Sequence, residues 1–533
     1  MTTDLATPPT QPAPARNPEN TVSRWWAPVA GLIVVVVAFA ATELVAALGV
    51  WAGLFNPAAA PITSLANTFI VLTPEWLKHF AIVTFGTNDK VALEVGMYAT
   101  IGIAALVIGF IAARWTKIAL AAVVVLAVIV GIAVITRANA TIFDLLPLAI
   151  GIALALIVFN KFFPARWTAT GAPAKPGVPD RRQFFRSAGL TAAGAVVAGG
   201  LSKVVPTGAA AIQSRSEIVL PKAAKPYVVP AGSSLDVPGI TALVTPNKDF
   251  YRIDASFQPP IINPGTWSMQ IKGLVDNPMT LTYSDISARP MVEAPITLTC
   301  VSNEVGGTLV GNAVWLGTPI RTVLQEAGVQ QGADCVLCTD VNGFTLSAPL
   351  EALMDDREAL FAVGMNGEPL PFEHGFPVRM VVPGLYGFVS ATKWIASMEL
   401  TTFSKVSAYW TQRGWSDHGP IKLSSRIDTP AGFASFAVGE SVVIGGMAWA
   451  QNTGVAKVEV QVDDDPWAEA TLSKPLSKDS WVQWKYTWKA KGSGPRTLRV
   501  RATDAAGKVQ TDQRAEPIPD GSSGWNSRTI TVT

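Results

Sequence analysis

Residues 296–303, Ile-Thr-Leu-Thr-Cys-Val-Ser-Asn, end a short apolar run on a single cysteine, Cys300. A thiolate is a soft, charge-donating ligand that suits a transition metal. A lone cysteine of this kind is more often a small buried hydrophobic residue. Cys335 and Cys338 are the other two cysteines; they can close at most one disulfide, or stand together in a buried strand. The rest of the chain must decide what Cys300 does.

Composition indicates a membrane protein with several domains. The chain has 533 residues, of which only 15% are charged, and its mean hydropathy is +0.32. The net charge is +2. No basic stripe or aromatic-interleaved basic cluster occurs in the sequence, so we exclude nucleic acid as a partner.

Four apolar runs have the length of membrane-spanning helices. They cover residues 27–53, 91–113, 118–136 and 141–160, within a membrane region of 25–163. Residues 61–86 are also apolar, but Glu75 and Lys78 lie in their middle, where a crossing would bury costly charges. We therefore expect an amphipathic or re-entrant segment there on the outer side. A fifth crossing is the alternative.

An arginine pair follows these runs, in Asp180-Arg-Arg-Gln-Phe-Phe-Arg186, before a weakly apolar, Gly/Ala-rich stretch that ends near residue 205. This is the form of a twin-arginine export signal placed internally. Positive-inside anchoring is the alternative. With a cytoplasmic tail of 1–24, four crossings return the chain to the cytoplasm before 180–205, so everything after about residue 210 lies outside. Such a multi-pass plasma-membrane protein would export its C-terminal half already folded, as a domain carrying a cofactor requires.

The exported half changes to short strands punctuated by Pro and Gly. We expect a linker over 206–235, one mixed domain over 236–404 and a small antiparallel sandwich over 405–533. In the mixed domain, Thr266–Lys272 alternates like a strand, and Thr318–Ala327 has the pattern of a short helix capped by its threonine. Four period-two strands are predicted in the sandwich, over 442–446, 455–462, 481–488 and 497–502.

The order of motifs in the exported half resembles the sulfite oxidase family of molybdenum-pterin oxidoreductases. The matching segments are Phe250-Tyr-Arg252, Trp267 with Gly273-Leu-Val-Asp-Asn-Pro278, Thr297–Asn303, Ala313-Val-Trp-Leu-Gly-Thr-Pro-Ile320, Met365-Asn-Gly-Glu-Pro-Leu-Pro371, His374-Gly-Phe-Pro-Val-Arg379, Val382-Pro-Gly384 and Lys393-Trp394. The whole chain is similar to actinobacterial membrane-anchored members. The resemblance implies a multi-domain protein: an α-helical transmembrane region, an α+β molybdopterin domain, and an immunoglobulin-like β-sandwich of the kind that often helps to form a homodimer.

The resemblance also implies a cofactor, molybdenum-molybdopterin, and a role for each matching residue. Cys300 would be the single protein thiolate on molybdenum and a catalytic residue. Cations would hold the pterin phosphate, His374 would donate a hydrogen bond to the cofactor, and Tyr251 and Tyr386 would be phenols for proton donation. Tyr386 can equally be a packing residue. The implied cofactor contacts are Phe250, Tyr251, Arg252, Thr339, His374, Arg379, Ser390, Ala391, Thr392 and Lys393.

Two departures from the family bear on the reaction. Sulfite-oxidising members follow the metal cysteine with an Asn-Arg-Arg run, whereas here Asn303 is followed by Glu304 and Val305. A carboxylate would repel a sulfite dianion, so we expect a small uncharged substrate, such as a sulfoxide or an uncharged donor. No Cys-x-x-Cys-His motif is present, so we expect no heme, and a separate electron carrier or quinone as redox partner.

Two other classes of function are compatible with parts of the sequence. A membrane-tethered, non-catalytic binding module would use the sandwich as its working end, but leaves the export signal without a purpose. A transporter or sensor built on the helices has poor support, because the predicted spans lack clustered polar residues and paired broken helices. The sequence favours the oxidoreductase.

Overall fold

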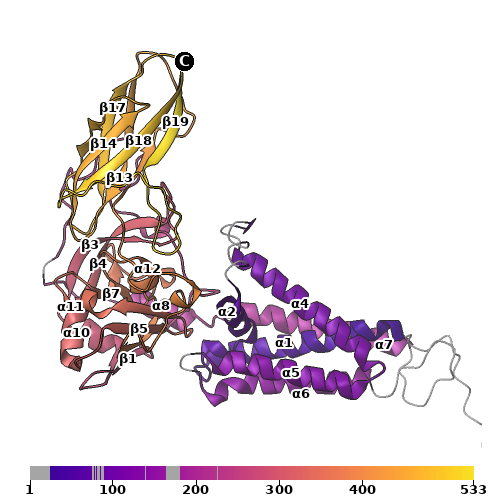
Figure 1. The fold of residues 1–533 in the computed structure, drawn as a ribbon. Coiled ribbons are helices and arrows are strands. Elements are labelled where there is room, and N and C mark those ends of the chain that lie inside the picture. The colour runs from indigo at the N-terminus through magenta and orange to yellow at the C-terminus, as the bar shows by residue number, and fades with distance from the viewer. Residues whose placement is uncertain are drawn as a thin grey trace, which may run out of the picture. The chain divides into compact units, whose positions relative to one another are not determined.

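The computed structural model describes residues 24–74, 77, 80, 84, 85, 89–137, 140–163, 181–224 and 226–533. These residues form two compact units, which are divided between Thr207 and Gly208 (Figure 1). The first unit is helical. The second contains four β-sheets.

Five helices of the described residues are long and apolar enough to cross a membrane. The apolar stretches are Ala27–Trp51, Val91–Ala112, Thr116–Ile135, Ile142–Phe162 and one that begins at Arg182. They correspond to α1 (Ala27–Trp51), α4 (Asp89–Ala112), α5 (Thr116–Ile135), the 3-10 turn Ile142–Leu145 with α6 (Leu146–Phe162), and α7 (Arg181–Val204). The first four agree with the four predicted apolar runs.

The uncertain stretch 61–86 contains a short helix, α2 (Pro61–Leu72). Twelve residues rise only about 18 Å as an α-helix, which is less than the hydrocarbon core. The Glu43 carboxylate of α1 accepts the Ile62 backbone N–H at 3.0 Å and so caps the start of α2. Most of residues 75–88 lie outside the described residues, so the choice between a re-entrant segment and a fifth crossing stays a prediction.

Two sheets build the domain that carries Cys300, the first mixed and the second antiparallel. One has the order β2-β1-β10-β5-β6, and the other has the order β3-β4-β7-β8, with β9 paired to β7. Their strands are β1 (Ser268–Gly273), β2 (Met279–Thr282), β3 (Val292–Thr299), β4 (Val310–Pro319), β5 (Cys335–Asp340), β6 (Thr345–Pro349), β7 (Leu360–Met365), β8 (Glu368–Pro369), β9 (Arg379–Val381) and β10 (Ile395–Thr401). The helices among them are α9 (Tyr283–Ser287), α10 (Ile320–Ala327), α11 (Leu350–Met354) and α12 (Gly387–Ser390).

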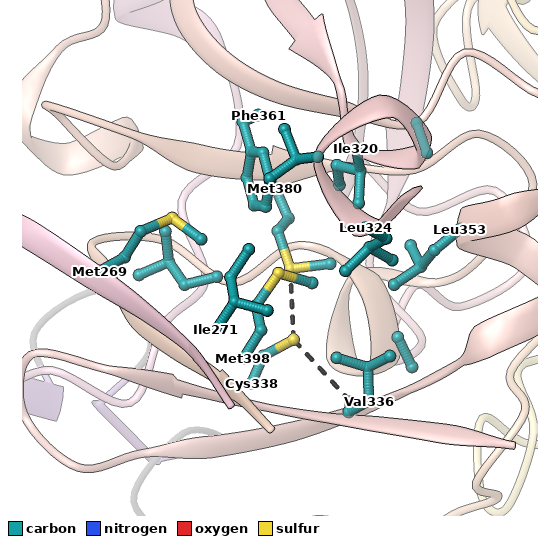
Figure 2. Close-up of a cluster of buried hydrophobic side chains, with 14 of the residues drawn as sticks. Met269, Ile271, Ile320, Leu324, Val336, Cys338, Leu353, Phe361, Met380 and Met398 are labelled. Atoms are coloured by element: carbon teal, nitrogen blue, oxygen red, sulfur yellow. Dashed lines mark hydrogen bonds between the residues drawn. The ribbon is translucent and has the colours of Figure 1, made fainter. Parts of the chain in front are cut away.

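The main core of this domain is rich in sulfur (Figure 2). Cys338 lies in it with its Sγ 3.4 Å from the Met380 Sδ. Cys335 and Cys338 are both free and buried in β5. Three residue steps along an extended strand place their Cα atoms about 10 Å apart, which is too far for a disulfide. The buried-strand interpretation of this pair is therefore the correct one.

One sequence prediction in this unit needs revision. The helix predicted over Thr318–Ala327 exists as α10, but its N-cap is Pro319 and no side chain caps it, because Thr318 belongs to β4 and is buried. The predicted linker 206–235 contains α8 (Ala209–Glu217), and most of its described residues are exposed or half-buried. From α8, Arg215 donates hydrogen bonds to the backbone carbonyls of residues 369 and 370. The strand predicted over 266–272 is present as β1.

The C-terminal region consists of two sheets that pack on a common core. The first contains β11 (Ser424–Thr429), β13 (Ser441–Trp449), β17 (Val482–Lys489) and β16 (Thr471–Leu472); the second contains β12 (Ser435–Phe436), β19 (Asn526–Val532), β18 (Gly494–Asp504), β14 (Val455–Val462) and β15 (Ala468–Glu469). Ile444 and Trp484 of one sheet meet Val460, Val500 and Ile530 of the other in this core. The four strands predicted from period-two alternation are present as β13, β14, β17 and β18.

Candidate active site around Cys300

Cys300 follows the last residue of β3 and is 8% exposed. Its backbone N–H donates to the Leu309 carbonyl at 2.9 Å, and its own carbonyl accepts the Asn303 N–H at 3.0 Å. The Asn303 side-chain oxygen accepts the Leu309 N–H at 2.8 Å. These bonds close residues 300–309 into a turn on which the thiol is mounted. Gly306 supports the turn with a φ of +82°, which glycine adopts without strain.

An aromatic group lies close to this turn. Phe250 is buried and stacks on Tyr251, with ring centroids 5.3 Å apart. Its ring edge also meets Trp315 at 5.8 Å and His374 at 5.6 Å. The Trp315 indole N–H donates to the Ile296 carbonyl in β3 at 3.1 Å. Phe250 therefore connects Tyr251 and His374 to the strand that leads into Cys300.

Two buried cations approach each other beside this aromatic group. The guanidinium of Arg379 lies 5.0 Å from the Trp315 ring and donates to the His374 carbonyl at 3.1 Å. The Lys393 ammonium donates to the Glu373 carbonyl at 2.9 Å. Gly375 separates them at a φ of +109°, where an added Cβ would lie 2.9 Å from the Arg379 Cβ and 3.2 Å from the Lys393 Cβ. A larger residue at 375 would push the two cations apart.

The carboxylate of Asp254 balances part of this positive charge. The Asp254 side chain is 7% exposed, and its Oδ2 lies 3.2 Å from the Lys393 Nζ and 3.0 Å from the Arg252 Nε. Burial lowers the pKa of Lys393 to about 8, an effect that Asp254 opposes, and lowers the pKa of Arg379 to about 10. Asp254 thus pairs with two cations, and the charge of Arg379 acts on Lys393 as well. A surplus of positive charge at a buried site suits an anionic ligand.

His374 is neutral in this environment. Burial, and then the charges of Lys393 and Arg379, lower its pKa to about 3. Its Nε2 lies 3.0 Å from the Asn247 carbonyl and must be the protonated nitrogen. Its Nδ1 is then an acceptor; it is buried and has no hydrogen-bond partner among the described residues. In this tautomer Nδ1 can only accept a hydrogen bond. The donation by His374 to a cofactor stays a prediction.

The two phenols predicted as proton donors occupy different surroundings. Burial, and then the nearby Cys300, raise the pKa of Tyr251 far above its usual range, so this phenol keeps its proton. A Cβ added at Gly387 would lie 3.9 Å from the Tyr251 hydroxyl and 3.8 Å from the Thr299 carbonyl oxygen. Burial raises the pKa of Tyr386 to about 12. Its hydroxyl accepts the Lys422 N–H at 3.4 Å and faces Gly521, so the packing interpretation describes Tyr386 better.

The thiol of Cys300 is protonated in the absence of a metal. Burial raises its pKa, which the backbone N–H of Ser302 and the charge of Lys393 only partly offset. Deprotonation would have to accompany metal binding. Within the described residues, no group of three or more His, Cys, Asp and Glu side chains is placed to hold a metal ion.

The segment before Lys393, whose residues are predicted cofactor contacts, is bonded in part within the protein. The Ser390 hydroxyl already donates to the carbonyls of its own turn, at 2.9 and 3.1 Å, so it is not a free donor. Ala391 and Thr392 connect α12 to Lys393, and the Thr392 carbonyl accepts the Met380 N–H at 2.9 Å. Thr339 lies in β5, paired with β6 and β10, and is half-buried. Just after the end of β5, the Val341 N–H donates to the Trp394 carbonyl at 3.0 Å.

The arrangement fits a phosphate-bearing organic cofactor that offers a metal to one thiol. The fit rests on the cationic group and on two buried polar atoms without a partner among the described residues, the His374 Nδ1 and the Thr299 Oγ1. Asp254, Trp315 and Thr299 belong to the site, but the sequence reasoning missed them. Asp254 had a weak signal, since it stands two residues after Arg252.

Several known proteins are similar in sequence to this region of the chain. A family model, the oxidoreductase molybdopterin binding domain, matches residues 256–410. The uncharacterized oxidoreductase YuiH of Bacillus subtilis is 35% identical over 153 residues, which cover 29% of this chain and 74% of that protein. Mitochondrial sulfite oxidase of Mus musculus is 29% identical over 337 residues, which cover 54% of this chain and 59% of that protein.

Two further comparisons each cover more than half of this chain. Sulfite oxidase of Arabidopsis thaliana is 25% identical over 350 residues, which cover 55% of this chain and 87% of that protein. The crystal structure of the sulfane dehydrogenase SoxCD from Paracoccus pantotrophus aligns with a TM-score of 0.47 and 21% identity, over 58% of this chain and 88% of that chain. The chain therefore spans between about three fifths and nine tenths of the length of these proteins.

Proposed function

This chain belongs to the sulfite oxidase family of molybdopterin-binding oxidoreductases, and we propose that it is a membrane-anchored, exported member that catalyses oxygen-atom transfer on a small uncharged substrate. One observation carries the proposal: the charge of the buried Lys393 acts on the Cys300 thiol, and Lys393 shares the Asp254 carboxylate with Arg252. The His374 Nδ1 and the Thr299 Oγ1 of the same site are buried and lack a partner among the described residues. Family membership decides against the alternative of a non-catalytic binding module.

Each residue of the site has a role in this proposal. Cys300 would be the single protein thiolate, and the bound molybdenum-molybdopterin would supply the oxygen-atom transfer chemistry. Arg252, Arg379 and Lys393 would hold the phosphate through charge-assisted hydrogen bonds. His374 would accept a hydrogen bond at Nδ1. Tyr251, which stays protonated, would donate a hydrogen bond or a proton close to Cys300.

The proposed substrate class follows from the two residues that come after Asn303 in the turn. Glu304 is exposed, and Val305 next to it is apolar. A carboxylate at this position repels a dianion and leaves a neutral molecule unaffected. An uncharged oxygen acceptor, such as a sulfoxide, or an uncharged donor is the proposed substrate, and sulfite is disfavoured.

The proposed location combines the helices with the arginine pair. Five apolar helices of spanning length support anchoring in the plasma membrane. Arg181 and Arg182 would direct the folded C-terminal half across by the twin-arginine route, which places the catalytic domain on the extracytoplasmic side. Electrons would pass to or from a separate carrier or a quinone, without a heme in this chain. The C-terminal sandwich would be an immunoglobulin-like domain that joins two copies into a homodimer.

Metal analysis of the purified full chain tests the cofactor assignment. We expect near-stoichiometric molybdenum in the wild type and an altered metal spectrum in Cys300→Ser. Cys335→Ala is the matched control, because Cys335 is also a buried free cysteine but lies in β5. Wild-type protein without molybdenum, or a Cys300→Ser spectrum identical to the wild type, would contradict the proposal.

Two further experiments test export and substrate class separately. Replacing both Arg181 and Arg182 by lysine should retain residues after 210 in the cytoplasm while the earlier helices remain inserted. Protease access to that half from the outer face would count against the topology. Glu304→Arg should raise kcat/KM for sulfite relative to that for a neutral sulfoxide. An unchanged ratio would remove Glu304 from the account of specificity.

A further inference from the structure

The strand that leads into Cys300 lies at the edge of its sheet. β3 pairs with β4 on one side only, and an edge strand exposes unpaired backbone groups. Here, loops of the C-terminal sandwich supply the missing partners. The Thr297 N–H donates to the Asp479 carbonyl at 3.0 Å, the Gln451 amide donates to the Thr297 carbonyl at 3.2 Å, and the Ser477 hydroxyl donates to the Pro295 carbonyl at 2.7 Å.

The turn after Cys300 is held by the same sandwich. The Ser522 hydroxyl donates to the Asn303 carbonyl at 2.6 Å, and the Arg426 Nη1 donates to the Gly307 carbonyl at 2.8 Å. An added Cβ at Gly306 would collide with the side-chain amide of Asn526, so the turn passes directly beneath β19. Both sides of Cys300 are therefore bound to a domain that begins more than a hundred residues later in the chain.

Arg426 is itself fixed by its neighbours. It is 5% exposed, its Nε donates to the Asp428 carboxylate at 2.6 Å, and its Nη2 donates to the Thr241 hydroxyl at 2.9 Å. A planar guanidinium held at these two points keeps one orientation for its Nη1 donor. Its bond to Gly307 is therefore a fixed attachment.

A continuous series of hydrogen bonds joins Ser522 to the thiol-bearing residue. Ser522 bonds to the carbonyl of Asn303, the Asn303 side chain accepts the Leu309 N–H, and the Leu309 carbonyl accepts the Cys300 N–H. Removing the first bond frees the Asn303 backbone and loosens every later bond in the series. The direction of the Cys300 side chain thus depends on the sandwich.

We propose that the C-terminal sandwich orients Cys300, with Ser522 and Arg426 as positioning residues that hold the turn of residues 303–307. The functional meaning of this role rests on the proposed function, since a metal ligand needs a fixed direction. The orientation itself exists without the metal. The sandwich is then part of the active site as well as a candidate dimerisation domain.

Alkylation of the cofactor-free full chain tests this role. Iodoacetamide labelling is followed at each cysteine by peptide mass spectrometry, because Cys300 is 8% exposed whereas Cys335 and Cys338 are 0% and 1% exposed. Ser522→Ala should speed labelling of Cys300 by roughly twofold to tenfold, the factor that corresponds to one net hydrogen bond. The rates at Cys335 and Cys338 should not change, because global unfolding would expose all three cysteines together.

Matched variants separate orientation from general stability. Ser523→Ala removes the neighbouring hydroxyl, which donates at 2.8 Å to the Gln513 carbonyl within the sandwich, and should leave all three rates unchanged. Ser522→Thr keeps the hydroxyl and should restore the wild-type rate. Arg426→Lys keeps the charge but loses the fork of donors, and should also speed labelling of Cys300.

Two outcomes would overturn the proposal. One is equal labelling of Cys300 in the wild type, Ser522→Ala and Arg426→Lys. The other is a parallel increase at all three cysteines. The labelling readout needs no metal, so it is independent of the metal analysis. If metal analysis of the purified wild type found no molybdenum while the contrast between Ser522→Ala and Ser523→Ala held, the proposed function would be refuted and the positioning role would stand.

Discussion

Asp254→Asn should destabilise the cofactor-free protein more than Lys393→Met does, although both changes break the same ion pair. Asp254 and Lys393 are 7% and 9% exposed and lie 3.2 Å apart. Asp254→Asn leaves the buried ammonium with only the Glu373 carbonyl. Lys393→Met leaves Asp254 paired with Arg252 at 3.0 Å. The two variants therefore differ in whether a buried charge loses its counter-charge.

The magnitudes follow from the buried geometry. At an effective dielectric constant of 20, two charges 3.2 Å apart attract by roughly 5 kcal/mol, and desolvation of both groups offsets most of this. Removing one partner of a buried pair costs about 3–5 kcal/mol, which we expect for Asp254→Asn. Lys393→Met should cost about 1–2 kcal/mol because Arg252 remains. The double variant should cost much less than the sum of the two.

The assay is urea denaturation of the detergent-solubilised full chain, with pulse proteolysis reporting on residues 208–533. Asp356→Asn is the control, since Asp356 pairs with Arg321 on the surface and should show little effect. A larger loss in Lys393→Met than in Asp254→Asn would refute this reasoning. So would additive effects in the double variant, because groups in contact must couple.

Three further outcomes are expected. The folded-state pKa of His374 is about 3, below its ordinary 6.5, so the unfolded chain binds more protons than the folded chain as the pH falls from 6.5 towards 3. The free energy of unfolding therefore falls over that window by up to roughly 5 kcal/mol. His374→Gln should show a shallower pH dependence of the urea midpoint. Gly273→Ala should lower the thermal midpoint more than Gly332→Ala does: both glycines have positive φ, but only at 273 would a Cβ strike the backbone of β10, and equal shifts would exclude that collision. Cys335 and Cys338 should both react with a thiol reagent in denaturant without prior reduction, and failure to react would reveal a disulfide against the strand geometry.

Local patterns were enough to predict the elements whose side chains follow one period. The apolar runs of α1, α4, α5 and α6, and the alternation in β13, β14, β17 and β18, express local rules that need no distant partner. The motif order also identified Cys300, Arg379 and Lys393 as site candidates. The predicted cap at Thr318 failed because that residue continues β4, which a one-dimensional pattern does not reveal.

The sequence by itself determined the apolar helices of spanning length and the family. It also led to two hypotheses, the export signal and Cys300 as the metal ligand. Only the tertiary structure showed that Asp254 lies between two cations, that His374 must accept at Nδ1, and that Ser522 and Arg426 reach the turn after Cys300. The physical reason is the separation along the chain of the residues that set each property. Periodicity and motif order are set by neighbours along the chain, whereas charge balance, tautomer and the support of an edge strand depend on groups that folding brings together from positions more than a hundred residues apart.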